Sequence, residues 1–352
     1  MAAGLESVST APLLMSVAWC LLFVLASVLG CWFFLSWSQR AGWFDSPNDR
    51  SSHERPTPTR AGAVLVALLI VGFFFAFRNE SITALAMLAL CLSGLAIAAI
   101  GWIDDVTPLP IIPRLVVQMI AMGVGIAFLG VAEWVVVLGD LTFTGRPLIA
   151  ACFVAGVWFI NLFNFMDGID GIAGSEAAFV GLSAAILCAL RGDDAMVLAW
   201  LALSGAAIGF LYWNWAPARL FMGDVGSGFL GFFIVILMLL AIQRGALSVS
   251  TCFILVAPFV MDASVTLVRR FLQGEVWYAG HRVHAYQTLG RRWGSHARVT
   301  VALLALNFSF IMPAAALAHF KPHLGLPVAA GVAAVLAGLV LFAGAGRPER
   351  IG

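Results

Sequence analysis

Charged residues are scarce in this sequence. Asp, Glu, Lys and Arg make up only 11% of its 352 residues, and Lys321 is the single lysine. A soluble domain of this length needs far more charged surface, so a soluble globular protein is excluded. The formal net charge of +1 says nothing by itself about partners, and we predict no nucleic-acid partner.

Several other signals are absent as well. The apolar segment 13–35 is too long for a cleavable signal peptide and has no basic region before it. The six cysteines all lie inside apolar runs without the spacing of a metal site, so we interpret them as small buried hydrophobic side chains. The sequence has no low-complexity segment and no obvious internal repeat.

Hydrophobic residues are abundant instead. They make up 62% of the chain, including 27 Phe and 12 Trp. Apolar runs of about 17–25 residues alternate with short polar stretches, which is typical of membrane-spanning helices. We therefore predict an all-α polytopic membrane protein, one domain over residues 1–352, with about eleven spans and ten as the alternative. The predicted spans lie near 13–35, 62–77, 82–102, 115–131, 148–162, 175–190, 195–212, 228–243, 249–268, 299–318 and 326–344.

Basic residues are divided unevenly between the two sets of connections that these spans define. One set carries 14 of the 19 Lys and Arg residues, which places it in the cytoplasm and the N-terminus outside. This set comprises 36–61, 103–114, 163–174, 213–227, 269–298 and the C-terminal tail. On the other side, 132–147 alternates apolar and polar residues around Gly139-Asp140, which predicts a small extracytoplasmic β-hairpin, with an irregular loop as the alternative.

The densest polar stretch lies between two apolar segments, from Asn161 to Gly174. Its Asn161, Asn164, Asp167 and Asp170 recur every three residues, so a continuous helix would place them on one polar stripe. Polar groups at the edge of an apolar span cost solvation free energy, so their presence indicates a function. We interpret the stretch as one wall of a metal-dependent site for phosphate chemistry. A stripe packed against another helix is the alternative.

Adjacent carboxylates end the third predicted span, at Asp104 and Asp105. They repel each other unless a cation or an arginine such as Arg114 lies beside them. Successive helical residues point about 100° apart, so one carboxylate could face a metal while the other orients a ligand or Arg114. The alternative is a polar helix end, which the helix dipole disfavours at a C-terminus.

A glycine-rich turn opens the eighth predicted span, from Phe221 to Gly228. Such a turn can bring a carboxylate and backbone N–H groups to a Mg²⁺ or anion site. We predict Asp224 as a metal ligand and Ser227 near the helix cap, with simple capping as the alternative.

Two further cytoplasmic connections carry groups suited to phosphate. In 45–60 these are Arg50, Ser51, Ser52, His53 and Arg60, although a solvated linker is an alternative. In 269–298, His281 and His284 would share a helical face with Gln287. The two histidines could bind zinc, but no third ligand lies nearby in the sequence. The neighbouring Arg282 favours a phosphate-binding site instead. Within the ninth span, Asp262 is expected to pair structurally with Arg269 or Arg270.

Together these motifs resemble a known family over essentially the whole chain. The resemblance is to the polyprenyl-phosphate N-acetylhexosamine-1-phosphate transferases, the membrane enzymes of glycosyltransferase family 4. The matching motifs are Pro47-Asn48-x-Arg50-Ser51-Ser52-His53, Asp104-Asp105, Asn161-x-x-Asn164-x-x-Asp167-Gly-x-Asp170-Gly, Phe221-Met-Gly-Asp224-x-Gly-Ser227 and His281-Arg-x-His284-x-Tyr-Gln.

The resemblance implies an enzyme of the bacterial inner membrane with its active site at the cytoplasmic face. It implies transfer of a sugar 1-phosphate from a UDP-N-acetylhexosamine to undecaprenyl phosphate with release of UMP, and dependence on Mg²⁺, with Mn²⁺ as a substitute. The peptidoglycan branch, a phospho-muramoyl-pentapeptide transferase, has a triple-histidine signature. This sequence has His281-Arg-Val-His284-Ala-Tyr-Gln287 there and looks like the branch that starts O-antigen or other surface-glycan synthesis. The peptidoglycan enzyme and, in another class, a polytopic transporter remain the alternatives.

The resemblance also implies residue roles. Asp224 and Asp105 are the expected metal ligands. The expected catalytic residues are Asp104, Asp105, Asp167, Asp170, His281 and His284. The expected substrate-binding residues are Asn161, Asn164, Arg50, Ser52, His53, Arg60, Arg114, Arg282, Gly223 and Ser227. The oligomeric state is left open, with a homodimer as one alternative.

Overall fold

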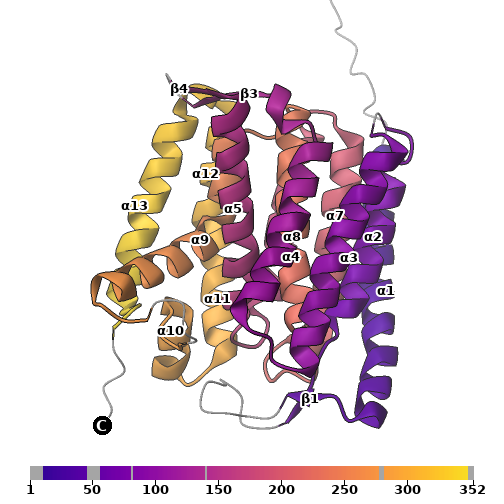
Figure 1. The fold of residues 1–352 in the computed structure, drawn as a ribbon, viewed down its shortest axis with the longest axis vertical. Coiled ribbons are helices and arrows are strands. Elements are labelled where there is room, and N and C mark those ends of the chain that lie inside the picture. Colours follow the sequence, from indigo (N-terminus) through magenta and orange to yellow (C-terminus); the bar gives the residue numbers. More distant parts are fainter. Residues whose placement is uncertain (1–10, 46–55, 81, 139–140, 277–280, 348–352) are drawn as a thin grey trace, which may run out of the picture.

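The computed structural model describes residues 11–45, 56–80, 82–138, 141–276 and 281–347 as a bundle of helices that run roughly along one direction (Figure 1). The helices are α1 (Ala11–Ala41), α2 (Gly62–Phe77), α3 (Ala84–Val106), α4 (Ile111–Phe128), α5 (Gly145–Phe165), α6 (Ile172–Ala189), α7 (Asp194–Asn214), α8 (Asp224–Gln243), α9 (Val249–Leu272), α10 (Ala285–Trp293), α11 (His296–Leu306), α12 (Met312–Phe320) and α13 (Gly325–Ala343). The predicted all-α polytopic fold is confirmed.

Membrane-spanning length separates α2 from the other apolar helices. Among the described residues, ten helices are long and apolar enough to cross a membrane, and α2 is a shorter apolar helix of 16 residues. The tenth predicted span is one continuous run, 296–320, in which a π-helical turn over Asn307–Ile311 joins α11 to α12. Each predicted span coincides with a helix or a helical run, and the ten helices of membrane-spanning length leave out only α2 among the eleven.

Burial places α8 at the centre of the bundle. Buried residues make up 89% of the apolar stretch of α8 but only 11% of that of α1, so most side chains of α1 lie on the outside of the bundle. Helices α2, α3 and α5 pack directly against α8. Because interiors are close-packed, the N-terminus of α8, which begins at Asp224, is held in place by its neighbours.

Short antiparallel strand pairs lie at opposite ends of the bundle (Figure 1). At one end β1 (Phe44–Asp45) pairs with β2 (Thr57–Pro58). At the other end β3 (Val135–Leu138) pairs with β4 (Leu141–Thr144), from Val135 opposite Thr144 to Leu138 opposite Leu141. The predicted hairpin is thus confirmed, whereas its expected turn at Gly139-Asp140 lies outside the described residues.

Glycine allows α2 to approach the start of α8 at backbone distance. A Cβ atom on Gly62 would lie 2.2 Å from the Cα of Gly226, far below a normal contact. The backbone N–H of Gly62 donates to the carbonyl oxygen of Met222 at 2.8 Å. Close approach through small residues is a common way for membrane helices to associate.

This contact predicts that Gly62→Ala destabilises the protein. The added methyl would meet backbone that cannot move away cheaply, so a loss of about 1–3 kcal/mol is expected. Thermal unfolding in detergent should show a lower midpoint for Gly62→Ala. Gly331→Ala in α13 is the matched control, because nothing lies within 4 Å of its added Cβ. Equal midpoints for Gly62→Ala and the wild type would contradict the packing.

Candidate active site

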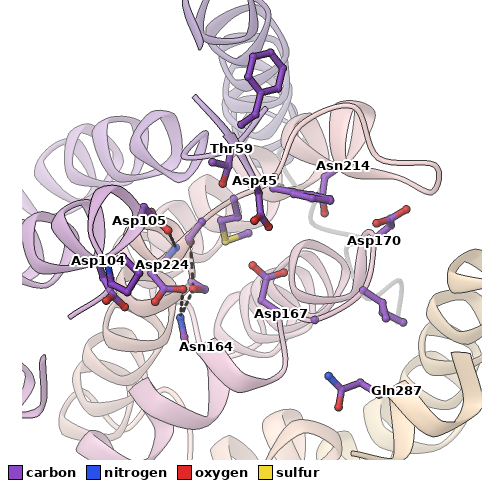
Figure 2. Close-up of a pocket in the computed structure, with 18 residues that line it drawn as sticks. Asp45, Thr59, Asp104, Asp105, Asn164, Asp167, Asp170, Asn214, Asp224 and Gln287 are labelled. Carbon is purple, nitrogen blue, oxygen red and sulfur yellow. Dashed lines mark hydrogen bonds between the residues drawn. The ribbon is translucent and has the colours of Figure 1, made fainter. Parts of the chain in front are cut away.

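A cavity of about 510 Å³ opens at the end of the bundle that carries β1 and β2 (Figure 2). Five of the six segments that the charge distribution assigned to the cytoplasm, namely the five connections between spans, contribute to its wall. The lining residues are Phe44, Asp45, Thr59, Asp104, Asp105, Pro108, Asn164, Asp167, Gly168, Ile169, Asp170, Asn214, Phe221, Met222, Gly223, Asp224, Ser227 and Gln287. Six of these described residues are aspartates and none is basic, so the cavity is strongly acidic.

Asp105 fastens α3 to the start of α8. Its two carboxylate oxygens accept hydrogen bonds from the backbone N–H groups of Asp224 at 2.8 Å and Val225 at 3.0 Å. These N–H groups have no partner within the helix, and the positive end of the helix dipole favours a carboxylate there. Gly223 makes the contact feasible: its φ is +72°, and a Cβ atom there would lie 2.6 Å from Asp105 Oδ2.

Asp224 projects from this helix start into the cavity, and its side chain is 36% exposed. Its Oδ1 accepts from Asn164 Nδ2 at 2.9 Å, and its Oδ2 accepts from Arg114 Nη1 at 3.2 Å. Arg114 also forms an ion pair with Asp104, whose Oδ1 accepts from the backbone N–H of Leu109 at 2.6 Å. Arg114 therefore offsets the repulsion between two of the carboxylates.

Asp167 and Asp170 lie in the turn between α5 and α6. The predicted polar stripe is not continuous, because α5 ends at Phe165 and α6 begins only at Ile172. Asp170 is fixed in this turn: its Oδ2 accepts from the backbone N–H of Ala218 at 3.1 Å. Asp167 accepts no hydrogen bond from the described residues. Burial raises the pKa of its carboxyl to about 7, and the nearby Asp105 and Asp170 carboxylates contribute to the rise.

The cavity suits a hard divalent cation that retains water or substrate ligands. Among the described residues, no group of three or more His, Cys, Asp or Glu side chains forms a complete protein-only metal site. Mg²⁺ commonly takes one or two carboxylates and completes its shell with water and phosphate oxygens. Two carboxylates fit this role. The side chain of Asp224 is partly exposed to the cavity, and the carboxylate of Asp167 accepts no hydrogen bond from the described residues. The two oxygens of Asp105, by contrast, already bind the start of α8.

Several residues expected at the site lie outside the cavity lining. Arg60 is buried, with its guanidinium 5.2 Å from the ring centre of Trp43 and 5.7 Å from that of Trp102, and it donates to the backbone oxygen of Asp105 at 2.7 Å. Asn161 donates to Gln118 Oε1 at 2.7 Å within the bundle. Both therefore support the site from behind. Arg50, Ser52 and His53 lie outside the described residues.

The histidine segment supports α10 rather than lining the cavity. Asp262 accepts from the backbone N–H groups of Ala285 at 2.8 Å and Tyr286 at 3.0 Å, so the expected pairing with Arg269 or Arg270 is wrong. His284 is buried at the start of α10. Burial lowers the pKa of His281 to about 3, and the Arg270 guanidinium adds to this effect, so His281 is neutral at pH 7. Arg282, like both histidines, does not line the cavity.

The structure also brings in residues that the sequence motifs did not assign to the site. Asp45, Thr59, Asn214 and Gln287 line the cavity. Asn214 orients the turn after α5, because its Oδ1 accepts from the backbone N–H of Gly171 at 3.0 Å. The sequence offered one signal that Asn214 belongs to the site: it is a polar amide at the end of the long apolar run of α7. Expected residues that do lie together here include Asn164 and Ser227, which share a hydrogen bond of 2.8 Å.

Comparisons with known proteins agree with this arrangement. A sequence model described as glycosyl transferase family 4 matches residues 86–242, which include Asp104, Asp105, Asn164, Asp167 and Asp224. The chain is 27% identical over 294 residues to a Bacillus subtilis (strain 168) protein named probable undecaprenyl-phosphate N-acetylglucosaminyl 1-phosphate transferase, covering 78% of this chain and 77% of the relative.

Relatives from two branches are also similar. The decaprenyl-phosphate N-acetylglucosaminephosphotransferase of Mycobacterium tuberculosis (strain ATCC 25618 / H37Rv) is 27% identical over 337 residues, with 85% of this chain and 83% of the relative covered. The phospho-N-acetylmuramoyl-pentapeptide-transferase of Prochlorococcus marinus (strain MIT 9313) is 36% identical over 198 residues, with 50% of this chain and 52% of the relative covered. The chain is therefore similar to glycosyl transferase family 4 over residues 86–242 and, at 27% identity, to polyprenyl-phosphate N-acetylglucosamine-1-phosphate transferases over most of its length.

Proposed function

We propose that this protein transfers an N-acetylhexosamine 1-phosphate from a UDP-sugar to undecaprenyl phosphate, forming undecaprenyl-diphosphate-sugar and UMP. The reaction takes place at the cytoplasmic face of the bacterial inner membrane and starts O-antigen or related surface-glycan synthesis. The observation that carries the proposal is that residues of the family-like motifs at 104–105, 161–171 and 221–227, together with Gln287, line one acidic cavity at the end of a polytopic bundle. The excess of basic residues in the connections at that end supports a cytoplasmic site.

Electrostatic repulsion is the main obstacle to this reaction. Both substrates are anionic, and six aspartates line the cavity without a basic residue among the described lining residues. A divalent cation held by these carboxylates would reduce the local negative charge and would offer positive charge to phosphate oxygens. Asp224 and Asp167 would hold Mg²⁺, with Mn²⁺ as a substitute; when bound, the cation would neutralise the pyrophosphate oxygens and the leaving UMP.

The chain's own residues position the reacting groups. Asp105 fixes the start of α8, and Asn164 and Arg114 orient the Asp224 carboxylate through the bonds described above. An oxygen of the lipid phosphate attacks the phosphorus that carries the sugar, and the bond from this phosphorus to the bridging oxygen of UMP breaks. No strong base is required, because a phosphate monoester with a second pKa of about 6 is mostly ionised at pH 7. Catalysis then rests on alignment and charge neutralisation.

The proposed reaction predicts UMP release by the purified protein. Incubation with undecaprenyl phosphate, Mg²⁺ and UDP-N-acetylhexosamines, including UDP-GlcNAc and UDP-GalNAc, should yield UMP with at least one donor. EDTA should abolish the release, and added Mg²⁺ should restore it. Folded protein that releases no UMP with any donor would refute the enzyme. Release with UDP-N-acetylmuramoyl-pentapeptide alone would assign it to peptidoglycan synthesis instead.

The site geometry predicts that two aspartate variants differ in kind. Asp224→Asn removes a cation ligand and relieves repulsion, so turnover should fall at least about 100-fold without loss of thermal stability. Asp105→Asn turns an N–H donor toward the N–H groups of α8, so both turnover and the unfolding midpoint should fall. Enzyme assays and thermal unfolding measure the two effects.

The matched control for these variants is Asp194→Asn at the opposite end of the bundle. Asp194 is an exposed residue in the first turn of α7, so its replacement should leave turnover near the wild-type value. Near-normal turnover of Asp224→Asn at limiting Mg²⁺ would contradict its role as a ligand. An unchanged unfolding midpoint for Asp105→Asn would contradict the anchoring of α8.

A further inference from the structure

Helix α10 contributes Gln287 to the described cavity lining, from the side that faces Asp167 and Asp170. Figure 2 shows this side chain extending from its own helix with the amide turned toward the cavity. The residue is only 9% exposed, so little of its amide is open to bulk solvent. The preceding mechanism gives this side chain no role.

A hydrogen bond determines which end of the amide is free. The backbone N–H of His284 donates to Gln287 Oε1 at 3.3 Å, which is the capping-box bond at the start of α10. Nε2 is therefore left on the cavity side, and the structure gives it no hydrogen-bond partner among the described residues. It lies 3.1 Å from the position that a Cβ atom on Gly168 would occupy, so glycine at 168 keeps this space open.

The segment that carries this amide is firmly held. Asp262 of α9 binds the backbone N–H groups of Ala285 and Tyr286. The hydroxyl of Tyr286 donates to the backbone oxygen of Phe165 at the end of α5, at 2.9 Å. Because these bonds order α10 before any ligand arrives, a hydrogen bond from Gln287 costs little extra conformational entropy.

The chemistry of this position suits a neutral acceptor. A neutral amide N–H beside several carboxylates is a poor partner for another anion without a cation, whereas Asp224 and Asp167 serve the phosphates through Mg²⁺. The sugar is the neutral part of the donor that is attached directly to the transferred phosphate, and the acetamido carbonyl of an N-acetylhexosamine is an oxygen that only accepts hydrogen bonds. We propose that Gln287 donates a hydrogen bond from Nε2 to this carbonyl oxygen and thereby selects N-acetylhexosamines over hexoses.

This inference rests on the proposed function, because it names the donor group that the same cavity recognises. A buried polar contact of this kind discriminates strongly, since a ligand or protein that lacks one partner leaves the other unsatisfied. Gln287 is thus a specificity residue, and its replacement should change the ratio between two nucleotide sugars rather than the binding of both.

The test is equilibrium binding of UDP-GlcNAc and UDP-glucose, which lacks the acetamido group, to the full-length purified protein with Mg²⁺. The wild type should prefer UDP-GlcNAc. Gln287→Met should weaken the binding of UDP-GlcNAc by about 10- to 100-fold and change the affinity for UDP-glucose by less than about 3-fold. Gln287→Glu keeps the oxygen that caps α10 but removes the donor, so the preference should be lost in this variant too.

Gln243→Met is the matched control, because Gln243 lies at the other end of α8, where its amide donates to the backbone oxygen of Leu129 at 3.0 Å. The ratio of its affinities for UDP-GlcNAc and UDP-glucose should equal that of the wild type. Three outcomes would each overturn the inference. The first is an equal loss of affinity for both nucleotide sugars, and the second is an unchanged affinity ratio in Gln287→Met. The third is a preference for UDP-GlcNAc that Gln287→Glu retains.

Parallel assays of UMP release separate the two proposals. If the wild type releases UMP but the Gln287 variants keep its binding ratio, the inference fails and the proposed reaction stands. If no donor yields UMP although the ratio changes as expected, the proposed reaction fails and the recognition of the acetamido group stands.

Discussion

The bond between Asp105 and the start of α8 is the constraint on which the rest of the site depends. Both carboxylate oxygens accept backbone N–H groups, from Asp224 and Val225, so α3 fixes where the central helix begins. This places the Asp224 carboxylate beside Asp104 and Arg114 and toward Asp167 across the cavity (Figure 2). The arrangement concentrates negative charge, which is unfavourable for the fold alone and fits the proposed binding of a cation together with anionic substrates.

The bundle withstands this repulsion because its interior is apolar and closely packed around α8. Gly62 lets α2 approach the start of that helix at backbone distance, and Arg60 is held between Trp43 and Trp102 while it donates to the backbone of Asp105. These contacts lie behind the cavity, and its described lining does not include Gly62, Arg60, Trp43 or Trp102. Stability and chemistry are therefore divided between two layers of residues, and substitutions in each layer should have different signatures.

Sequence patterns predicted the spans well, because each apolar run had to satisfy its backbone within a helix. The charge distribution also predicted which connections share one end of the bundle. The contacts of individual side chains were harder to predict: Asp262 binds the start of α10 and not an arginine, because the nearest unsatisfied N–H groups come from a segment distant in sequence. The prediction of one polar stripe through Asn161 and Asp167 was wrong, because α5 ends at Phe165. Gln287 belonged to a predicted motif without an assigned role, and only the fold, which places α10 against the cavity, put it in the lining.

Cation binding is the most direct test of this account. Electron paramagnetic resonance can follow Mn²⁺ bound to the purified protein, with and without UDP-GlcNAc, in the wild type and in Asp224→Asn. We expect the wild type to bind Mn²⁺, UDP-GlcNAc to tighten this binding because its phosphates would complete the coordination shell, and Asp224→Asn to lose most of both effects. Mn²⁺ binding that is equally tight in Asp224→Asn, or unaffected by the nucleotide sugar, would contradict the account.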